Sequence, residues 1–320
     1  MRKCLAAVLM LTVCLFPAMT SFAWNAAGHE LVDLIAYQQL TPAARLAVGK
    51  LLRQHPRYDK DLLANKPEDV DADLWAFLIA GTWPDVVRSQ SHPMMHTENH
   101  SVWHYVDYPF NLGTAKGSVP EEEWVPGTDP KNLLQAMTKI QADLNDAAVK
   151  DSDKAIRLCW LEHLIGDLHQ PLHASALFSD RFPQSDRGGN SQIVQPQNGK
   201  PINLHFYWDS AVTTDATLPA VVKLAAELTS DPVLSREALK DELSHGAVKD
   251  WVMESYAVCK SIVYRDGTLP SSVARASRGA ISNGVPPLPE GYEADAAKTA
   301  RHRIVLAGYR LADRINAIYK

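Results

Sequence analysis

Apolar residues recur three and four positions apart in several long segments, and this spacing predicts amphipathic helices. The first helix is expected over residues 28–40, with Leu31 and Ile35 on its apolar face. A second should begin after Thr41, a good N-cap, with Pro42 at its first position. Further helices are expected over 67–78, 129–144, 156–168 and 294–319, with others from residue 219 onward.

Strand signals are few and short. Asn198-Gly199 separates the apolar stretches 192–194 and 202–204, which is the pattern of a β-hairpin. Residues 102–108 are rich in aromatic and β-branched side chains and are expected to be extended. Loops are expected over 111–130 and much of 175–197. With no internal repeat and no linker, the pattern predicts a mainly α fold, a single compact helical domain with one small β-hairpin.

The N-terminus has the features of a secretory signal peptide. Arg2 and Lys3 precede an apolar run over residues 5–16, and small residues stand before Trp24. We therefore expect residues 1–23 to be removed and residues 24–320 to form the mature domain, exported to the periplasm or secreted. The apolar run is too short to span a bilayer, so no membrane anchor is expected.

The charge balance excludes one class of nucleic-acid binder. The chain has 32 basic and 37 acidic residues, a net charge of −5. Removal of Arg2 and Lys3 leaves 30 basic against 37 acidic residues, a net charge of −7. This balance argues against a broad basic groove for nucleic acid. A cluster of divalent cations would nevertheless make one pocket of an acidic protein locally positive.

Two cysteines, Cys159 and Cys259, remain in the mature chain. An exported protein can oxidise such a pair to a disulfide. Cys159 also lies in an apolar helical stretch where a free buried thiol is equally expected, so both states stay open.

The most informative stretch runs from His163 to His173 and reads HLIGDLHQPLH. His163 and Asp167 are four residues apart, so they project from one face of the expected helix. Pro171 cannot continue that helix, and the turn it causes brings His173 back toward the same pocket. His169 points to the far side and is expected to be structural. The alternative is a core helix whose polar residues are only hydrogen bonded.

Histidine and aspartate recur in the same combination elsewhere. His205 and Asp209 repeat the four-residue spacing. Imidazole and carboxylate ligands without thiolate suit zinc in a site that keeps positions open for water, as catalytic sites do. Three further histidines lie within residues 89–101, where polar neighbours favour a solvated loop over a set of ligands. The candidate metal ligands are Trp24, His29, Asp85, His104, His163, Asp167, His173, His205 and Asp209.

Several motifs together resemble the S1/P1 nuclease family in content and order. They are Trp24 with Gly28-His29, Trp83-Pro84-Asp85, the WHYVD segment 103–107, residues 163–173, Gly188-Gly189-Asn190, residues 203–209 and the AGYRLA segment 307–312. The resemblance covers essentially the whole mature chain. It implies a mostly helical fold, similar also to that of zinc phospholipase C, with three zinc ions.

The resemblance also implies which residues bind each zinc. One ion would be held by Asp85, His104, His163 and Asp167. A second would be held by the Trp24 amine and carbonyl, His29 and the bridging Asp167. The third would be held by His173, His205 and Asp209. Asp107 matches an acid that orients the attacking water, and Arg88 matches a basic residue able to bind phosphate. The alternatives are a turn cap for Asp107 and a surface salt bridge for Arg88.

The implied activity is an endonuclease that hydrolyses phosphodiester bonds of single-stranded DNA and RNA to products with 5′-phosphates, by attack of metal-activated hydroxide. A 3′-nucleotidase activity on 3′-mononucleotides is a further expectation, and the protein is expected to be a monomer. Unpaired bases can stack on aromatic side chains, for which the candidates are Tyr105, Tyr108, Phe178, Phe182 and Tyr207. Two alternatives stay open: a zinc-dependent phospholipase C and a non-enzymatic zinc-binding protein.

Overall fold

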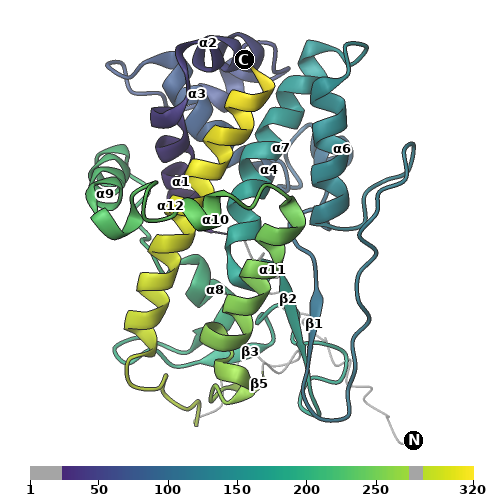
Figure 1. Ribbon diagram of the computed structural model, residues 1–320, viewed down its shortest axis with the longest axis vertical. Coiled ribbons are helices and arrows are strands. Elements are labelled where there is room, and N and C mark those ends of the chain that lie inside the picture. The colour runs from purple at the N-terminus through teal and green to yellow at the C-terminus, as the bar shows by residue number, and fades with distance from the viewer. Residues whose placement is uncertain (1–23, 274–283) are drawn as a thin grey trace, which may run out of the picture.

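The computed structural model describes residues 24–273 and 284–320, which are mostly helical with two small sheets. The expected mainly α architecture is confirmed. Figure 1 shows α12 running along most of the molecule, with the strands gathered at the end away from α2 and α3. The longer helices are α1 (Ala26–Gln39), α2 (Pro42–Leu52), α3 (Ala72–Ala80), α6 (Leu133–Asn145), α7 (Asp151–His169), α9 (Leu218–Ser230), α11 (Val248–Val258) and α12 (Tyr292–Ile318).

The centre of the molecule is built by α1, α7 and α12, which pack on one another. Along its last three turns α7 is buried on every side, so it has no solvent-facing stripe. Gly308 lets α12 approach α1 closely, because a Cβ at this position would lie 2.6 Å from Cγ2 of Ile35. Polar side chains on the inner turns of these helices are therefore held away from water, where they need partners.

Helix starts follow the local capping chemistry. Thr41 caps α2 by accepting a hydrogen bond from the Ala44 amide, as expected. Two predicted starts were too early. The helix expected from residue 67 begins after Asp71, whose carboxylate accepts from two amides of the first turn. The helix expected from residue 129 begins after Asn132, whose side chain accepts from the Gln135 amide. In both cases a later Asp or Asn satisfies the free amides better than the first candidate.

The strands form two sheets. In one, β1 (Tyr108–Asn111) pairs in parallel with β2 (Ser175–Phe178). In the other, β3 (Gln192–Val194) lies between β4 (Ile202–Asn203) and β5 (Ser272–Val273), and its antiparallel pairing with β4 confirms the hairpin. The extended segment expected over 102–108 is wrong in its first half, because residues 101–104 form a turn. The loop expected from residue 175 is wrong at β2, since a short strand becomes stable only through its partner.

Short helical segments complete the described chain. They are α4 (Trp83–Val86), α5 (Met95–Glu98), α8 (Leu204–Asp209), α10 (Lys240–Leu243), π-helical turns at Tyr58–Leu62 and Cys259–Val263, and 3-10 turns at Pro171–His173, Pro232–Leu234 and Arg265–Gly267. Cys159 and Cys259 are buried and free, so they form no disulfide. Among the described helices, none has the length and apolar content needed to cross a membrane. The expected signal peptide, residues 1–23, lies outside the described residues.

Candidate metal centre

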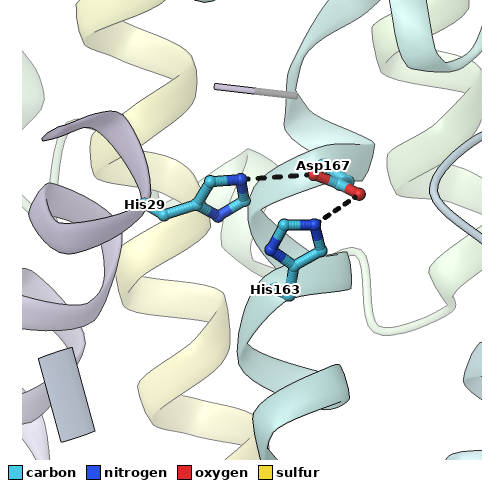
Figure 2. A group of neighbouring side chains, drawn as sticks. All are labelled: His29, His163 and Asp167. Carbon is cyan, nitrogen blue, oxygen red and sulfur yellow. Dashed lines mark ion pairs between the residues drawn. The ribbon is translucent and has the colours of Figure 1, made fainter. Parts of the chain in front are cut away.

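Asp167 is the centre of the site, and two histidines from different helices face it. On α7, Nε2 of His163 lies 3.2 Å from Oδ2 of Asp167. From α1, Nε2 of His29 lies 3.4 Å from Oδ1 of the same carboxylate. Figure 2 shows both rings turned toward Asp167, and they stack with centroids 4.2 Å apart. These three residues, here the His29 group, could hold one metal ion.

A second set, the Asp85 group, consists of Asp85, His104 and His163. Asp85 is carried by α4 and His104 by the turn before β1. Nδ1 of His104 lies 2.9 Å from Nε2 of His163 and 3.0 Å from Oδ2 of Asp167. Because His163 belongs to both sets, the two groups adjoin, and Asp167 can serve as a bridge between two ions.

A third set, the Asp209 group, consists of His173, His205 and Asp209. His173 ends the 3-10 turn after α7, and the other two lie four residues apart on α8. The Nε2 atoms of the two histidines are only 3.0 Å apart, and Nε2 of His205 is 3.7 Å from Oδ1 of Asp209. All three side chains are buried. The turn at Pro171 therefore returns His173 to the pocket as predicted.

Backbone carbonyls orient three of the histidine rings. Nδ1 of His163 donates to the carbonyl of Gly81 at 2.7 Å, and Nδ1 of His205 donates to the carbonyl of Gly188 at 2.6 Å. Nδ1 of His173 donates to the carbonyl of His104. Since a carbonyl only accepts, the proton of each neutral ring is held on Nδ1. In the neutral form of each ring, the lone pair of Nε2 is left to point into the cluster, as a metal ligand requires.

The protonation states also suit a cation. Burial lowers the pKa values of His29, His104 and His173, and burial with the neighbouring His173 lowers that of His205 to about 3. Burial also acts to lower the pKa of His163, but the carboxylates of Asp167 and Asp85 raise it to about 9. Most of the imidazoles are thus neutral at pH 7 and able to bind metal.

Several buried polar atoms of the cluster lack a hydrogen-bond partner. Within the described residues these are both ring nitrogens of His29, Nε2 of His104, Oδ1 of Asp167 and Oδ2 of Asp209. An unpaired buried donor or acceptor is costly, and a bound cation satisfies several of them together. Nitrogen and carboxylate donors without sulfur suit zinc. The residues present therefore fit the metal that the sequence predicts.

Trp24 lies beside the Asp209 group. Its side chain is buried, and the next residue, Asn25, donates its amide to the carbonyl of Asp209 at 3.1 Å. Asn25 also caps α1, which carries His29 one turn later. The first residue of the expected mature chain is therefore held between two of the ligand groups. Its role as a ligand through a free amine stays a prediction.

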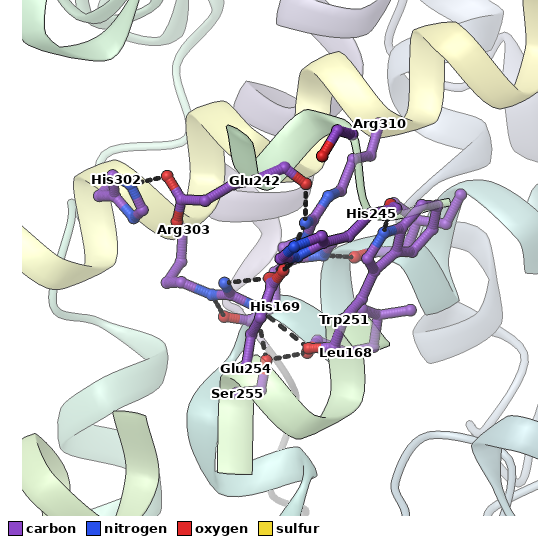
Figure 3. Close-up of polar contacts among 12 residues, drawn as sticks. Leu168, His169, Glu242, His245, Trp251, Glu254, Ser255, His302, Arg303 and Arg310 are labelled. Atoms are coloured by element: carbon purple, nitrogen blue, oxygen red, sulfur yellow. Dashed lines mark hydrogen bonds and ion pairs between the residues drawn. The ribbon is translucent and has the colours of Figure 1, made fainter. Parts of the chain in front are cut away.

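A buried network fixes the end of α7, from which the chain turns toward His173. In Figure 3, Arg303 and Arg310 reach from α12 to Glu254 and His169. Arg303 donates to the carbonyl of His169, and Nη1 of Arg310 lies 2.9 Å from the Nε2 of this ring. His169 thus faces away from the metal groups, as predicted. Ser255 donates to the carbonyl of Leu168, so the free carbonyls at this helix end are satisfied.

Gln170 is a site residue that sequence reasoning missed. Its Nε2 donates to Oδ1 of Asp209 at 2.7 Å, and its Oε1 accepts from the Leu172 amide at 2.7 Å. The residue is fully buried. Its amide group therefore orients a candidate ligand while it holds the turn that carries His173. Its place before Pro171 was the only available signal.

His104 of the Asp85 group and His173 and His205 of the Asp209 group line a cavity of about 790 Å³. Asp107, Arg88, Tyr105 and Arg187 are among the residues that line it. Burial, and then repulsion from Asp186, raises the pKa of Asp107 to about 6. Arg88 lines the cavity while its Nη1 pairs with Oδ1 of Asp85 at 3.1 Å, so it is both salt-bridged and directed at the site. Of the five aromatic candidates, Tyr105 is the one among the described cavity-lining residues.

The histidines of residues 89–101 are not among the described metal groups. His92 and His100 are half-buried and so less solvated than expected, whereas His96 on α5 is exposed. Nε2 of His92 lies 2.9 Å from the carboxylate of Asp61, and His100 stacks on Trp103 with centroids 3.8 Å apart.

Known proteins that resemble this chain are nucleases. The sequence model of the family described as S1/P1 Nuclease matches residues 24–320. Endonuclease 2 of Arabidopsis thaliana is 24% identical over 318 residues, which cover 95% of this chain and 93% of that protein. Endonuclease 4 of the same plant is 25% identical over 334 residues, covering 100% and 96%. Nuclease S1 of Aspergillus oryzae is 24% identical over 266 residues, covering 78% and 80%. The region matched by the family includes all nine candidate ligands.

Proposed function

Because the chain belongs to the S1/P1 nuclease family, we propose that it is an exported, zinc-dependent endonuclease that cleaves single-stranded DNA and RNA and leaves 5′-phosphates. Removal of phosphate from 3′-mononucleotides is proposed as a second activity of the same site. The observation that carries the proposal is that three His and Asp groups lie together beside one cavity: two of them share His163, and two of them contribute histidines to the cavity wall.

Three zinc ions are proposed, one for each group. The Asp85 group with Asp167 would hold the first, and the Asp209 group the third. His29, Asp167 and the amine and carbonyl of Trp24 would hold the second. Bound zinc lowers the pKa of a coordinated water and neutralises charge on phosphate oxygens. His163, Asp167 and the carbonyl-oriented rings keep the donor atoms in place before any ion arrives, which limits the reorganisation needed on binding.

Asp107 and Arg88 are proposed to act on the reactants. Asp107 lies in the cavity wall, where its carboxylate can accept a hydrogen bond from the attacking water and orient it. The guanidinium of Arg88, held beside Asp85, can donate to the non-bridging oxygens of the scissile phosphate. Asp107 can orient the attacking water and Arg88 can bind the phosphate in the same cavity. This pair of functions favours phosphodiester hydrolysis over metal storage.

Export is proposed because it completes the metal site. Signal peptidase cleavage before Trp24 would create the free amine that the second zinc needs. An α-amine has a pKa of about 7.7–8.0, so zinc displaces its proton readily near neutral pH. A chain that retains one extra residue before Trp24 is expected to bind less zinc.

Product analysis tests the proposal. The mature protein starting at Trp24 is incubated with a short single-stranded oligonucleotide, with and without a chelator. The expected result is chelator-sensitive cleavage to fragments that carry 5′-phosphates. A fully zinc-loaded protein that leaves the oligonucleotide intact would refute the nuclease proposal, and hydrolysis of phosphatidylcholine by that protein would favour the phospholipase alternative.

A further inference from the structure

The loop over residues 184–190 forms one wall of the cavity and is tightly anchored. Its anchor is the buried Asp186, which accepts hydrogen bonds from the Leu177 and Gly189 amides, the Gln192 side chain and the Tyr264 hydroxyl, at 2.8–3.0 Å. Four donors on one buried carboxylate hold this loop rigidly. The next residue, Arg187, is exposed and lines the cavity.

Arg187 stands in a backbone conformation that favours glycine. Its φ is +58°, in the left-handed region, and the two following glycines have φ of +58° and +81°. The backbone groups of Arg187 are used inside the loop, because its amide donates to Ser185 and its carbonyl accepts from Asn190. Glycine would adopt this conformation without strain, so the backbone gives no reason for an arginine. The arginine side chain therefore needs a role of its own.

The surroundings of Arg187 suit a phosphate. The protein carries more acidic than basic residues, 37 against 32. The described cavity lining, in contrast, has two arginines and one carboxylate, Asp107. Arg88, Tyr105 and Arg187 line the same cavity. In the described part of the chain, no hydrogen bond or ion pair engages the guanidinium of Arg187.

The two arginines serve different parts of the cavity. Arg88 pairs with Asp85, beside the first zinc position. Arg187 precedes Gly188, whose carbonyl orients His205 in the Asp209 group. The two arginines therefore lie beside different ligand groups. When the scissile phosphate of a strand lies near Arg88, the next phosphate along that strand is available to Arg187.

We propose that Arg187 binds a phosphate of the nucleic-acid strand next to the scissile one, and so makes the enzyme prefer polynucleotides to substrates with a single phosphate. This inference rests on the proposed function. The class of ligand is a single strand of at least three nucleotides, recognised through its backbone charge, which makes the contact independent of base sequence.

The test compares two substrates of the zinc-loaded enzyme: a single-stranded dodecamer and a dinucleoside monophosphate, which has only the scissile phosphate. R187G fits the backbone and removes the charge, whereas R187K keeps the charge. R181Q is the matched control, because Arg181 is also exposed but donates to the Ser271 carbonyl and does not line the cavity. Zinc content is measured for every variant.

For R187G we expect kcat/KM on the dodecamer to fall roughly 10-fold, with a clearly smaller loss on the dinucleoside monophosphate. The slope of log(kcat/KM) against log[salt] on the dodecamer should become shallower by about 0.7, the value for one phosphate contact on a single strand. R187K should keep the wild-type slope, and R181Q should change neither substrate.

Three results in R187G would overturn the inference. Equal losses on both substrates would mean that Arg187 acts on the scissile phosphate, and an unchanged salt slope would mean that it acts on bases. Loss of zinc would mean that it acts on the loop itself. Failure of the wild-type enzyme to cleave either substrate would instead refute the proposed function. The two failures are therefore distinguishable.

Discussion

Gly166 is predicted to be required by the metal site and not by the fold. It lies on α7 between His163 and Asp167, facing the ring of His29 on α1. A Cβ at this position would lie 2.7 Å from Nδ1 and 2.9 Å from Cε1 of His29. The substitution Gly166→Ala therefore pushes directly on one candidate ligand while it leaves the others in place.

The size of the effect follows from these distances. The His29 ring must retreat by about 0.7 Å to reach 3.4 Å, where ordinary contact begins. Metal–ligand distances hold to about 0.2 Å, so the ring is lost as a ligand, and zinc affinity of the His29 group should fall roughly 100-fold. Alanine gains roughly 0.5–1 kcal/mol in a helix interior, against about 1–3 kcal/mol for overpacking. The free energy of unfolding of the metal-free protein should therefore fall by no more than about 2.5 kcal/mol.

The assay is zinc content after dialysis against a zinc buffer, together with urea unfolding of the metal-free protein. Gly246→Ala is the matched control, because no described atom lies within 4 Å of a Cβ there. We expect Gly166→Ala to bind one zinc fewer than the wild type and to lose activity, whereas the control keeps both. A Gly166→Ala protein with the full zinc content and the wild-type rate would refute the assignment of His29 as a ligand.

Four further predictions concern single side chains. Gln170→Ala removes the donor to Asp209 and should weaken zinc binding at the Asp209 group roughly 10-fold. Competition with a chelator measures this affinity, and an unchanged value would exclude the orienting role of Gln170. Asp107→Asn should keep its zinc but hydrolyse oligonucleotides at least about 100-fold more slowly, whereas a storage protein would show no difference. Zinc binding at pH 7 should release the proton that the raised pKa of His163, about 9, retains in the metal-free protein, in addition to the proton of the Trp24 amine. Titration calorimetry in two buffers of different ionisation enthalpy should therefore show release of more than about one proton, and a smaller release would contradict the prediction. Burial and then the charge of Glu30 hold the pKa of Asp33 in the folded protein well above its usual value of 3.8. The protonated carboxyl therefore contributes its full stability below the unfolded pKa, and this contribution is lost as pH rises through the folded pKa. Asp33→Asn should raise urea stability at about pH 8 but not at about pH 4, and an equal gain at both pH values would show another cause.

Local sequence signals predicted much of the fold. Helical periodicity located α1, α7 and α12 to within a few residues, and the Asn198-Gly199 turn located the β3–β4 hairpin. The errors lie where a partner decides the structure. Residues 175–178 become a strand because they pair with β1, and residues 101–104 turn where Trp103 packs against Trp160 of α7. The sequence of one segment does not reveal which distant segment it will contact.

By itself the sequence determined the helices and the inventory of donor groups, because periodicity and spacing are local properties of the chain. It placed His163 and Asp167 on one face of a helix and His169 on the other. Only the tertiary structure decided that His29 packs on His163, that Gln170 holds Asp209, and that Gly81 and Gly188 set ring orientations. These contacts join residues that are separated in the chain. Those of His163 exist because the last three turns of α7 are buried on all sides, which brings their polar groups against partners from other elements.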